Sequence, residues 1–339
     1  MGVATAGESR DQRRQAQDVL TGVLQWLWDS AAGPALDALG HHHQLLAEAD
    51  WPRVWWVPGG VLGLLPLHAA GYHTDPAGDS GRRTVMDRVI SSYTPTIRAL
   101  RHARHTIREQ DPSPSAPGRG LVVAVPTTPG LPGHGRLRYV DAEAELVHRH
   151  LPRTVLLRES DPGAPDGPAS DTPTKAAILN HLSDCPIAHF ACHGASHAAD
   201  PSQSLLLLHD HASDPLTVAS LAPIRLDHAQ LAYLSACRTA AINSVELLDE
   251  SIHLTSAFQL AGFPQVVGTL WEIRDQTAVA VADAFYTHLR APTGALDTGR
   301  AAWALHQAVR DLRDGHDLPG TLDRTKVPFL WAAYLHAGA

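Results

Sequence analysis

Lysine, cysteine and long apolar runs are all scarce in this sequence, and each scarcity excludes a class of protein. No stretch approaches the roughly 20 consecutive apolar residues that a membrane-spanning helix needs, so no membrane span is expected. Lys175 and Lys326 are the only lysines, no long basic run occurs and the net charge is −8, so nucleic-acid binding is not expected either. The cysteines Cys185, Cys192 and Cys237 are odd in number, which does not suggest a disulfide framework and is typical of a reducing, cytoplasmic setting.

Several common motifs are also missing. The first residues contain no apolar core of signal-peptide length, and Ala6 stands where a myristoylation motif prefers Ser or Thr. The sequence has no G-x-x-x-x-G-K-[ST] phosphate loop and no G-x-S-x-G nucleophile elbow. We therefore expect neither a P-loop nucleotide hydrolase nor a serine hydrolase of the elbow type, and we expect no cofactor.

The remaining composition is that of a globular protein. With 339 residues, 44% of them apolar, the chain can form one large α/β domain with a helical appendage, or two domains. Pro, Gly and Ser cluster at residues 111–120, which we interpret as a linker. We therefore divide the chain into an N-terminal part, residues 1–110, and a larger part, residues 119–339.

The N-terminal part is predicted to contain helices and a β-hairpin. Apolar residues recur at helical spacing within residues 10–38, which predicts an amphipathic helix or helix pair interrupted at Pro34. Residues 53–70 read as a short strand, a glycine turn and a second strand. Residues 93–105 predict another helix, with a proline at its first turn.

Strands and helices alternate after the linker. Apolar runs predict strands at residues 121–125, 154–158, 186–193, 230–237, 265–271 and 327–337. Amphipathic runs predict helices at residues 140–151, 174–182, 252–262, 276–289 and 299–314. Continuous apolar strands that alternate with helices indicate a mostly parallel sheet covered by helices on both faces.

Two of the predicted strands end on a reactive side chain, His193 in one and Cys237 in the other. The carboxyl ends of parallel strands meet at one edge of a sheet, so the two side chains converge if the strands are neighbours. An imidazole beside a thiol helps to generate the nucleophilic thiolate. Gly194 lets the backbone approach a substrate closely, and its N–H could bind an oxyanion together with that of Cys237.

Two other interpretations compete with a His–Cys dyad. A cysteine at the end of an apolar strand is most often a small core residue, and we expect this of Cys192 and Cys185. His189, His193 and His197 are spaced four apart, which would suit zinc on a helix. In a strand, residues four apart lie roughly 13 Å from each other, too far for one ion, so we expect no metal site.

Several ordered motifs resemble the CHAT domain, a family of caspase-like cysteine peptidases that is related to separase and often attached to tetratricopeptide repeats. The resemblance covers roughly residues 20 to 339 and rests on the segments "WVPGGVLGLLPLHAA", "SSYTPTIRAL", "HFACHG", "DPSQSLLLLHD", "LSACRTA", "DESIHLTSAFQLAGFPQVVGTLWEIRD", "FYTHL" and "WAAYLHAG". It implies a caspase-like three-layer α/β/α sandwich with a mostly parallel sheet and an N-terminal helical and hairpin extension. It also implies that His193 is the general acid/base and Cys237 the nucleophile.

The resemblance extends to the substrate pocket. "LWEIRD" is similar to a separase segment whose last Asp lines the pocket for a P1 arginine, and Asp275 occupies that place. A carboxylate there would pair bidentately with a guanidinium; the other interpretation of Asp275 is a helix N-cap. Ser235 stands where metacaspases carry an acidic residue. Asp249 and Glu250 are secondary pocket candidates, or solvated loop charges.

The resemblance thus implies a cysteine endopeptidase that cuts protein substrates after Arg or Lys. CHAT domains are usually regulated by an attached repeat module, and no such repeat occurs in this sequence. We therefore expect regulation by a protein partner or a repeat-containing protein. The alternative is a catalytically silent CHAT-like module that binds other proteins, and labelling of Cys237 by an electrophilic peptide distinguishes the two.

Overall fold

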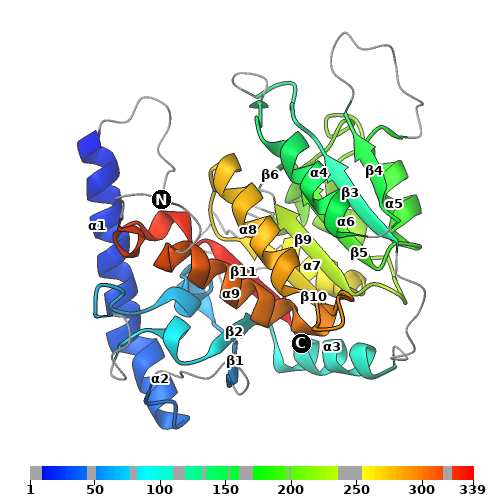
Figure 1. Ribbon diagram of the computed structural model, residues 1–339. Helices are drawn as coiled ribbons and strands as arrows, with labels where there is room; N and C mark the ends of the chain where they lie inside the picture. Colours follow the sequence, from blue (N-terminus) through cyan, green and yellow to red (C-terminus); the bar gives the residue numbers. More distant parts are fainter. Residues whose placement is uncertain are drawn as a thin grey trace.

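A computed structural model describes most of the chain, and its centre is an eight-stranded sheet (Figure 1). The described residues are 10–43, 51–76, 82–109, 119–131, 135–151, 153–159, 171–195, 197, 200–235, 254–315 and 323–339. In spatial order the strands are β1 (Arg53–Trp56), β2 (Ile90–Tyr93), β11 (Tyr334–Gly338), β10 (Gln265–Thr269), β9 (Leu231–Ser235), β5 (Ile187–Ala191), β3 (Gly120–Ala124) and β4 (Val155–Arg158). Only the β10–β11 pair is antiparallel, so the mostly parallel sheet is confirmed.

Helices cover both faces of this sheet. One face carries α4 (Val140–His150), α8 (Asp275–His288) and α9 (Ala301–Asp314), and the other carries α5 (Lys175–Leu182), α6 (Val218–Leu221) and α7 (Leu254–Ala261). Along β3, Val122 and Ala124 pack into the cluster beneath α4, α8 and α9, whereas Leu121 and Val123 pack into the cluster beneath α5 and α7. This alternation, which follows from the two-residue period of a strand, confirms the three-layer α/β/α arrangement.

The N-terminal helices form one nearly continuous rod. α1 (Arg10–Leu27) passes through a π-helical turn at Trp28–Ala32 into α2 (Gly33–Ala38). The predicted interruption at Pro34 is therefore a local change of helix type rather than a break, because proline lacks the N–H that a regular turn would use. Among the described residues, none of the helices combines the length and apolar character that crossing a bilayer requires.

The predicted hairpin at residues 53–70 is wrong. Only its first part, β1, is a strand, and β1 pairs in parallel with β2. The rest forms short 3-10 turns at Gly60–Leu64 and Leu67–Ala69. Gly60 has a positive φ of 56°, and Pro66 has no N–H to offer to a partner strand. The N-terminal part thus adds two strands to the main sheet, and β11 lies between them and β10.

The predicted linker, residues 111–120, falls mostly on residues outside the described part.

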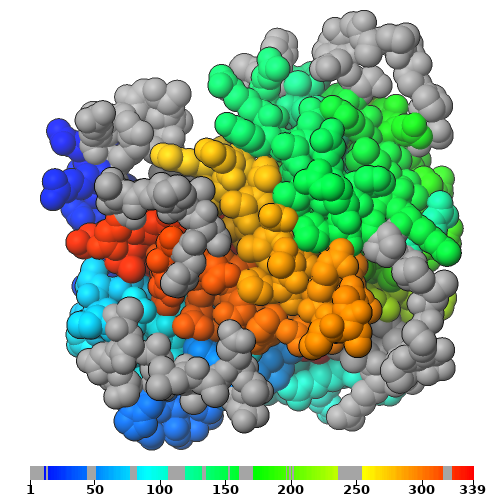
Figure 2. All heavy atoms as spheres, in the orientation of Figure 1, coloured from blue at the N-terminus to red at the C-terminus, as the bar shows by residue number. Residues whose placement is uncertain are grey.

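Other predicted elements differ in length. α3 (Ile97–Glu109) starts four residues after the predicted place, because Tyr93 belongs to β2, and a hydrogen bond from the Ala99 N–H to Thr96 Oγ1 caps it. The last predicted strand is shorter, because a 3-10 turn at Pro328–Leu330 precedes β11. Viewed as spheres, α8 and α9 spread across the middle of one face, between the N-terminal elements and α4 (Figure 2).

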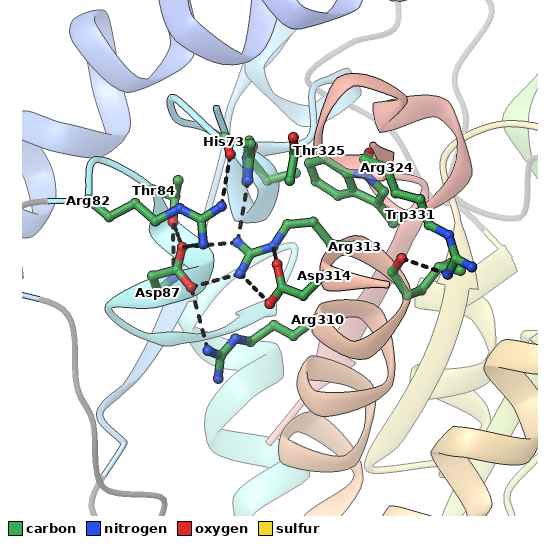
Figure 3. A network of polar contacts seen from close by, with 12 residues as sticks. His73, Arg82, Thr84, Asp87, Arg310, Arg313, Asp314, Arg324, Thr325 and Trp331 are labelled. Atoms are coloured by element: carbon green, nitrogen blue, oxygen red, sulfur yellow. Dashed lines mark hydrogen bonds and ion pairs between the residues drawn. The ribbon is translucent and has the colours of Figure 1, made fainter. Parts of the chain in front are cut away.

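A buried cluster of charged side chains joins the N-terminal part to α9 (Figure 3). The Asp87 carboxylate receives two hydrogen bonds from Arg313, at 2.8 and 3.0 Å. Arg82 lies 3.4 Å and Arg310 lies 3.6 Å from the same carboxylate, and Arg313 also pairs with Asp314 at 2.8 Å. Burial alone would raise the pKa of Asp87. The charges of Arg313 and Arg82, together with hydrogen bonds from Arg313 and Thr84, outweigh burial and hold that pKa well below its usual value.

We expect Asp87→Asn to destabilise the fold strongly. Three guanidiniums would lose their shared countercharge in a buried setting, and breaking a buried pair in this way costs about 3–5 kcal/mol. Urea unfolding measures the loss. Asp323→Asn is the matched control, because Asp323 pairs with Lys326 at 3.1 Å while the two side chains are 51% and 67% exposed, and such surface pairs contribute at most about 1 kcal/mol. Equal losses in the two variants would contradict the prediction.

Candidate active site

The two strands predicted to carry the dyad are neighbours. β5 and β9 run parallel, and Ala191 at the end of β5 pairs with Ser235 at the end of β9. The chains leaving these strands therefore emerge at the same edge of the sheet. Cys237 follows Ser235 by two residues and lies outside the described residues, as do Asp249 and Glu250.

His193 does not belong to the predicted strand but starts a new one. β5 ends at Ala191, and the chain turns at Cys192 into β6 (His193–Ala195). β6 pairs antiparallel with β7 (Leu205–Leu207), which pairs with β8 (Leu216–Thr217). This small second sheet holds the His193 backbone just beyond the edge of the main sheet and leaves the His193 side chain half-buried.

The other two cysteines are core residues, as predicted. The Cys192 side chain is 1% exposed and packs on the α5–α7 side of the sheet. Cys185 is equally buried in the same cluster, and burial raises the pKa of its thiol to about 11. A thiol that stays protonated at neutral pH is a poor nucleophile, so Cys185 is unsuited to a catalytic role, and burial shields Cys192 from a substrate.

A backbone carbonyl orients the His193 ring. The Nε2 atom lies 2.8 Å from the Gly135 carbonyl oxygen. A carbonyl oxygen only accepts hydrogen bonds, so Nε2 carries the hydrogen and donates it. In the neutral ring, Nδ1 is then the nitrogen with a lone pair and can act as the base. Sequence reasoning missed this partner, and its only signal was the glycine-rich segment that follows β3.

The Gly135 position requires glycine. Its φ is +55°, and a Cβ atom there would lie 3.0 Å from both Leu131 Cδ1 and Thr128 Cβ. Other residues rarely adopt such a φ without strain. Two residues on, the Leu137 N–H donates to the Pro126 carbonyl at 2.8 Å. The Gly135 carbonyl is thus held by a defined backbone conformation.

Asp275 is the first residue of α8 and lies at the same edge of the sheet, after β10. β10 pairs in parallel with β9. The N-cap position of α8 belongs to Arg274, so the interpretation of Asp275 as the N-cap is wrong. Instead, Asp275 Oδ2 accepts a hydrogen bond from the Arg138 N–H at 2.9 Å. The carboxylate is half-buried and reaches the segment that carries Gly135.

The histidines of the zinc alternative bind other partners. His189 is fully buried, with Nε2 3.0 Å from Glu143 Oε1 and Nδ1 3.2 Å from the Tyr286 hydroxyl. His197 Nδ1 accepts a hydrogen bond from the Asp200 N–H at 3.0 Å. Within the described ranges, no group of three His, Cys, Asp or Glu side chains is arranged to hold a metal ion.

Comparisons with known proteins agree with this architecture. The CHAT domain family model matches residues 21–339. Two crystal structures of the Saccharomyces cerevisiae separase–securin complex are similar, with TM-scores of 0.53 and 0.51, each at 12% identity over 84% of this chain. The chain spans only 15% of the length of those separase chains. A search of curated protein sequences gives no match.

A third similar structure is gingipain R, an Arg-specific cysteine proteinase, with a TM-score of 0.47 and 11% identity, covering 75% of this chain and 55% of that one. With a TM-score below 0.5, this similarity supports no conclusion about the present chain. The similarity to separase, at 12% identity, shows a shared fold and nothing more. The caspase-like fold expected from the sequence is confirmed.

Proposed function

The chain belongs to the CHAT domain family, and on that premise we propose that it is a cysteine endopeptidase with a His193–Cys237 dyad. The observation that carries the proposal is the His193 ring, whose Nε2 donates to the Gly135 carbonyl. This leaves Nδ1 as the base at the sheet edge toward which β9 and the following Cys237 run. No side chain is needed to orient the imidazole, because the backbone carbonyl fixes the tautomer.

The proposed reaction follows from these positions. His193 Nδ1 takes the proton from Cys237 Sγ, and the thiolate attacks the carbonyl carbon of the scissile bond. The N–H groups of Gly194 and Cys237 stabilise the oxyanion. The imidazolium then gives its proton to the leaving amine, and water hydrolyses the acyl-enzyme with His193 again as the base. The Gly135 carbonyl accepts from Nε2–H throughout and stabilises the charged ring.

An electrophilic peptide probe tests this assignment directly. We expect it to label Cys237 and to leave the buried Cys185 and Cys192 unmodified, which peptide mapping by mass spectrometry shows. A folded protein whose Cys237 remains unlabelled would favour the catalytically silent interaction module. A protein partner is part of either proposal, since the similar separase structures are complexes with securin.

We further propose that the peptidase cuts after Arg, with Lys as a weaker alternative, and that Asp275 provides the negative charge for the P1 side chain. Asp275 follows β10, the strand beside β9, so its carboxylate lies at the edge of the sheet where the dyad is proposed. A bidentate pair with a carboxylate favours guanidinium over ammonium. Ser235 at the end of β9 contributes to the pocket wall, and Asp249 and Glu250 are the secondary candidates for its charge.

We expect Asp275→Asn to reduce kcat/KM for peptides with P1 arginine by about a hundredfold. The bound guanidinium would lose its countercharge, a cost of roughly 2–5 kcal/mol for a buried charge pair. Peptides with a neutral P1 residue should be affected much less. Steady-state kinetics on a peptide series that differs only at P1 measures the difference. If kcat/KM falls equally for all P1 residues, Asp275 does not bind the P1 side chain, and Asp249 and Glu250 become the candidates for that role.

A further inference from the structure

Asp275 makes a contact that a substrate pocket does not require. Its Oδ2 accepts the backbone N–H of Arg138 at 2.9 Å, which joins two segments far apart in the chain. Arg138 precedes α4, which begins at Val140, and Asp275 is the first residue of α8. Both helix N-termini therefore lie close to the carboxylate, and both favour a negative charge there. The contact fixes the start of α4 relative to α8.

The same segment positions the catalytic histidine. Residues 135–138 are held at three points: the Gly135 carbonyl by His193 Nε2 at 2.8 Å, the Leu137 N–H by Pro126 at 2.8 Å, and the Arg138 N–H by Asp275 at 2.9 Å. Without the Asp275 contact, the Leu137–Pro126 hydrogen bond alone would hold this end of the segment. The Gly135 carbonyl that orients the His193 ring would then be less firmly placed.

We propose that Asp275 is a positioning residue for His193, acting through the Arg138 amide and the Gly135 carbonyl. The inference rests on the proposed peptidase function and adds to it a role of Asp275 that is independent of its charge. The S1 role needs a negative charge, whereas the positioning role needs only a hydrogen-bond acceptor. A P1 arginine bound to Asp275 would thus contact the same carboxylate that maintains the geometry of the base.

Two substitutions separate these roles. Asp275→Asn removes the charge but keeps an oxygen that can accept the Arg138 N–H, whereas Asp275→Ala removes both. On a peptide with a neutral P1 residue, we expect Asp275→Asn to lose less kcat than Asp275→Ala, because its amide oxygen still accepts the Arg138 N–H. Asp275→Ala should lose about tenfold to a hundredfold in kcat with little change in KM, because misplacing a reacting group by about 1 Å costs on this order.

A spectroscopic measurement tests the same inference without activity. The ¹⁵N chemical shifts of the His193 imidazole show which nitrogen carries the hydrogen. We expect the Nε2–H form in the wild type and in Asp275→Asn, and a mixture of both forms in Asp275→Ala. Asp283→Ala is the matched control: Asp283 also joins α8 to α4, through a 2.8 Å contact with His150 Nε2, and is 55% exposed. This control should change neither kcat nor the spectrum.

A second variant keeps the test decisive if Asp275→Ala does not fold. Arg138→Pro removes the donor N–H and leaves the Asp275 charge in place. It should lower kcat for every P1 residue and alter the His193 spectrum while retaining the preference for P1 arginine. The inference is overturned if a folded Asp275→Ala or Arg138→Pro protein shows wild-type kcat on the neutral peptide and an unchanged spectrum. If the wild type cleaves no peptide, the proposed function fails, but the spectrum still decides whether Asp275 fixes His193.

Discussion

Replacing Cys237 with alanine is expected to abolish peptide cleavage without changing the stability of the fold. Removing the nucleophile of a covalent mechanism costs several orders of magnitude, and we expect kcat/KM to fall by at least about a thousandfold. His193→Ala should be nearly as damaging. Because the two residues act as a unit, the double variant should be no slower than the worse single variant. Peptide hydrolysis, with urea unfolding of each variant, measures both effects.

The control for this result lies in the same segment of the chain. His197 is exposed, and its ring accepts only a local backbone N–H from Asp200, so His197→Ala should retain most of the activity. Cleavage by Cys237→Ala at the wild-type rate would exclude the dyad. If one equivalent of zinc copurifies with the wild type and is lost in His197→Ala, the histidines form a zinc site instead.

The positions of the central strands in the sequence could be predicted because long apolar runs bury both faces of a parallel strand. The strand β2, which lies between β1 and β11, was missed for the opposite reason. Its sequence "ISSY" is half polar, and its serines are satisfied by distant partners: Ser92 Oγ accepts from Arg53 Nε, and Ser91 Oγ accepts from Trp56 Nε1, each at 3.0 Å. A local pattern carries no information about such partners, which only the folded chain supplies.

Contacts between distant residues could not be predicted at the candidate site either. Reactive side chains such as His193 are visible in the sequence, and the resemblance to the CHAT family indicated their roles. The Gly135 carbonyl could not be predicted, because a backbone acceptor has no residue-type signature. The Asp275–Arg138 contact joins a side chain to an amide 137 residues away. Such contacts depend on how α4 and α8 pack, which periodicity does not specify.

Charged side chains at the junction of the N-terminal part and α9 lead to a prediction about acid stability. Three histidines there are buried: His68, His73 and His306. Burial lowers the pKa of His68 to about 4. Burial, reinforced by Arg313, lowers the pKa of His73 to about 3, and burial reinforced by Arg310 lowers the pKa of His306 to about 3. All three rings are neutral in the folded protein at neutral and mildly acidic pH.

The fold should therefore lose stability steeply below about pH 6.5. An unfolded histidine titrates near that pH, so the unfolded chain takes up protons that the folded chain cannot bind until the pH approaches 3–4. Stability falls wherever the unfolded state binds more protons, by about 1.4 kcal/mol per pH unit for each group. These three groups give about 4 kcal/mol per unit, which is large against a typical total of about 5–15 kcal/mol. His336, whose pKa is also lowered by burial, adds to the slope.

Asp87 contributes to the dependence of stability on pH only at lower pH. Its folded pKa lies below the unfolded value of about 3.9. Its stabilisation is therefore complete above about pH 4 and is lost as the pH falls through the folded pKa. Between pH 6.5 and about 4, the slope of stability against pH belongs to the buried histidines and not to this carboxylate. Urea unfolding at pH 7, 6 and 5 measures that slope.

Substituting one of the three histidines tests the origin of the slope. In His306→Phe the new ring can occupy the place of the imidazole, which lies 4.9 Å from the Trp51 ring, and it cannot be protonated. The loss of stability between pH 6 and 5 should then shrink by about 1.4 kcal/mol. His43→Phe, at a side chain exposed in the folded as in the unfolded chain, should leave the slope unchanged. If His306→Phe unfolds with the wild-type slope, the imidazole of His306 is not the group whose protonation destabilises the fold in acid.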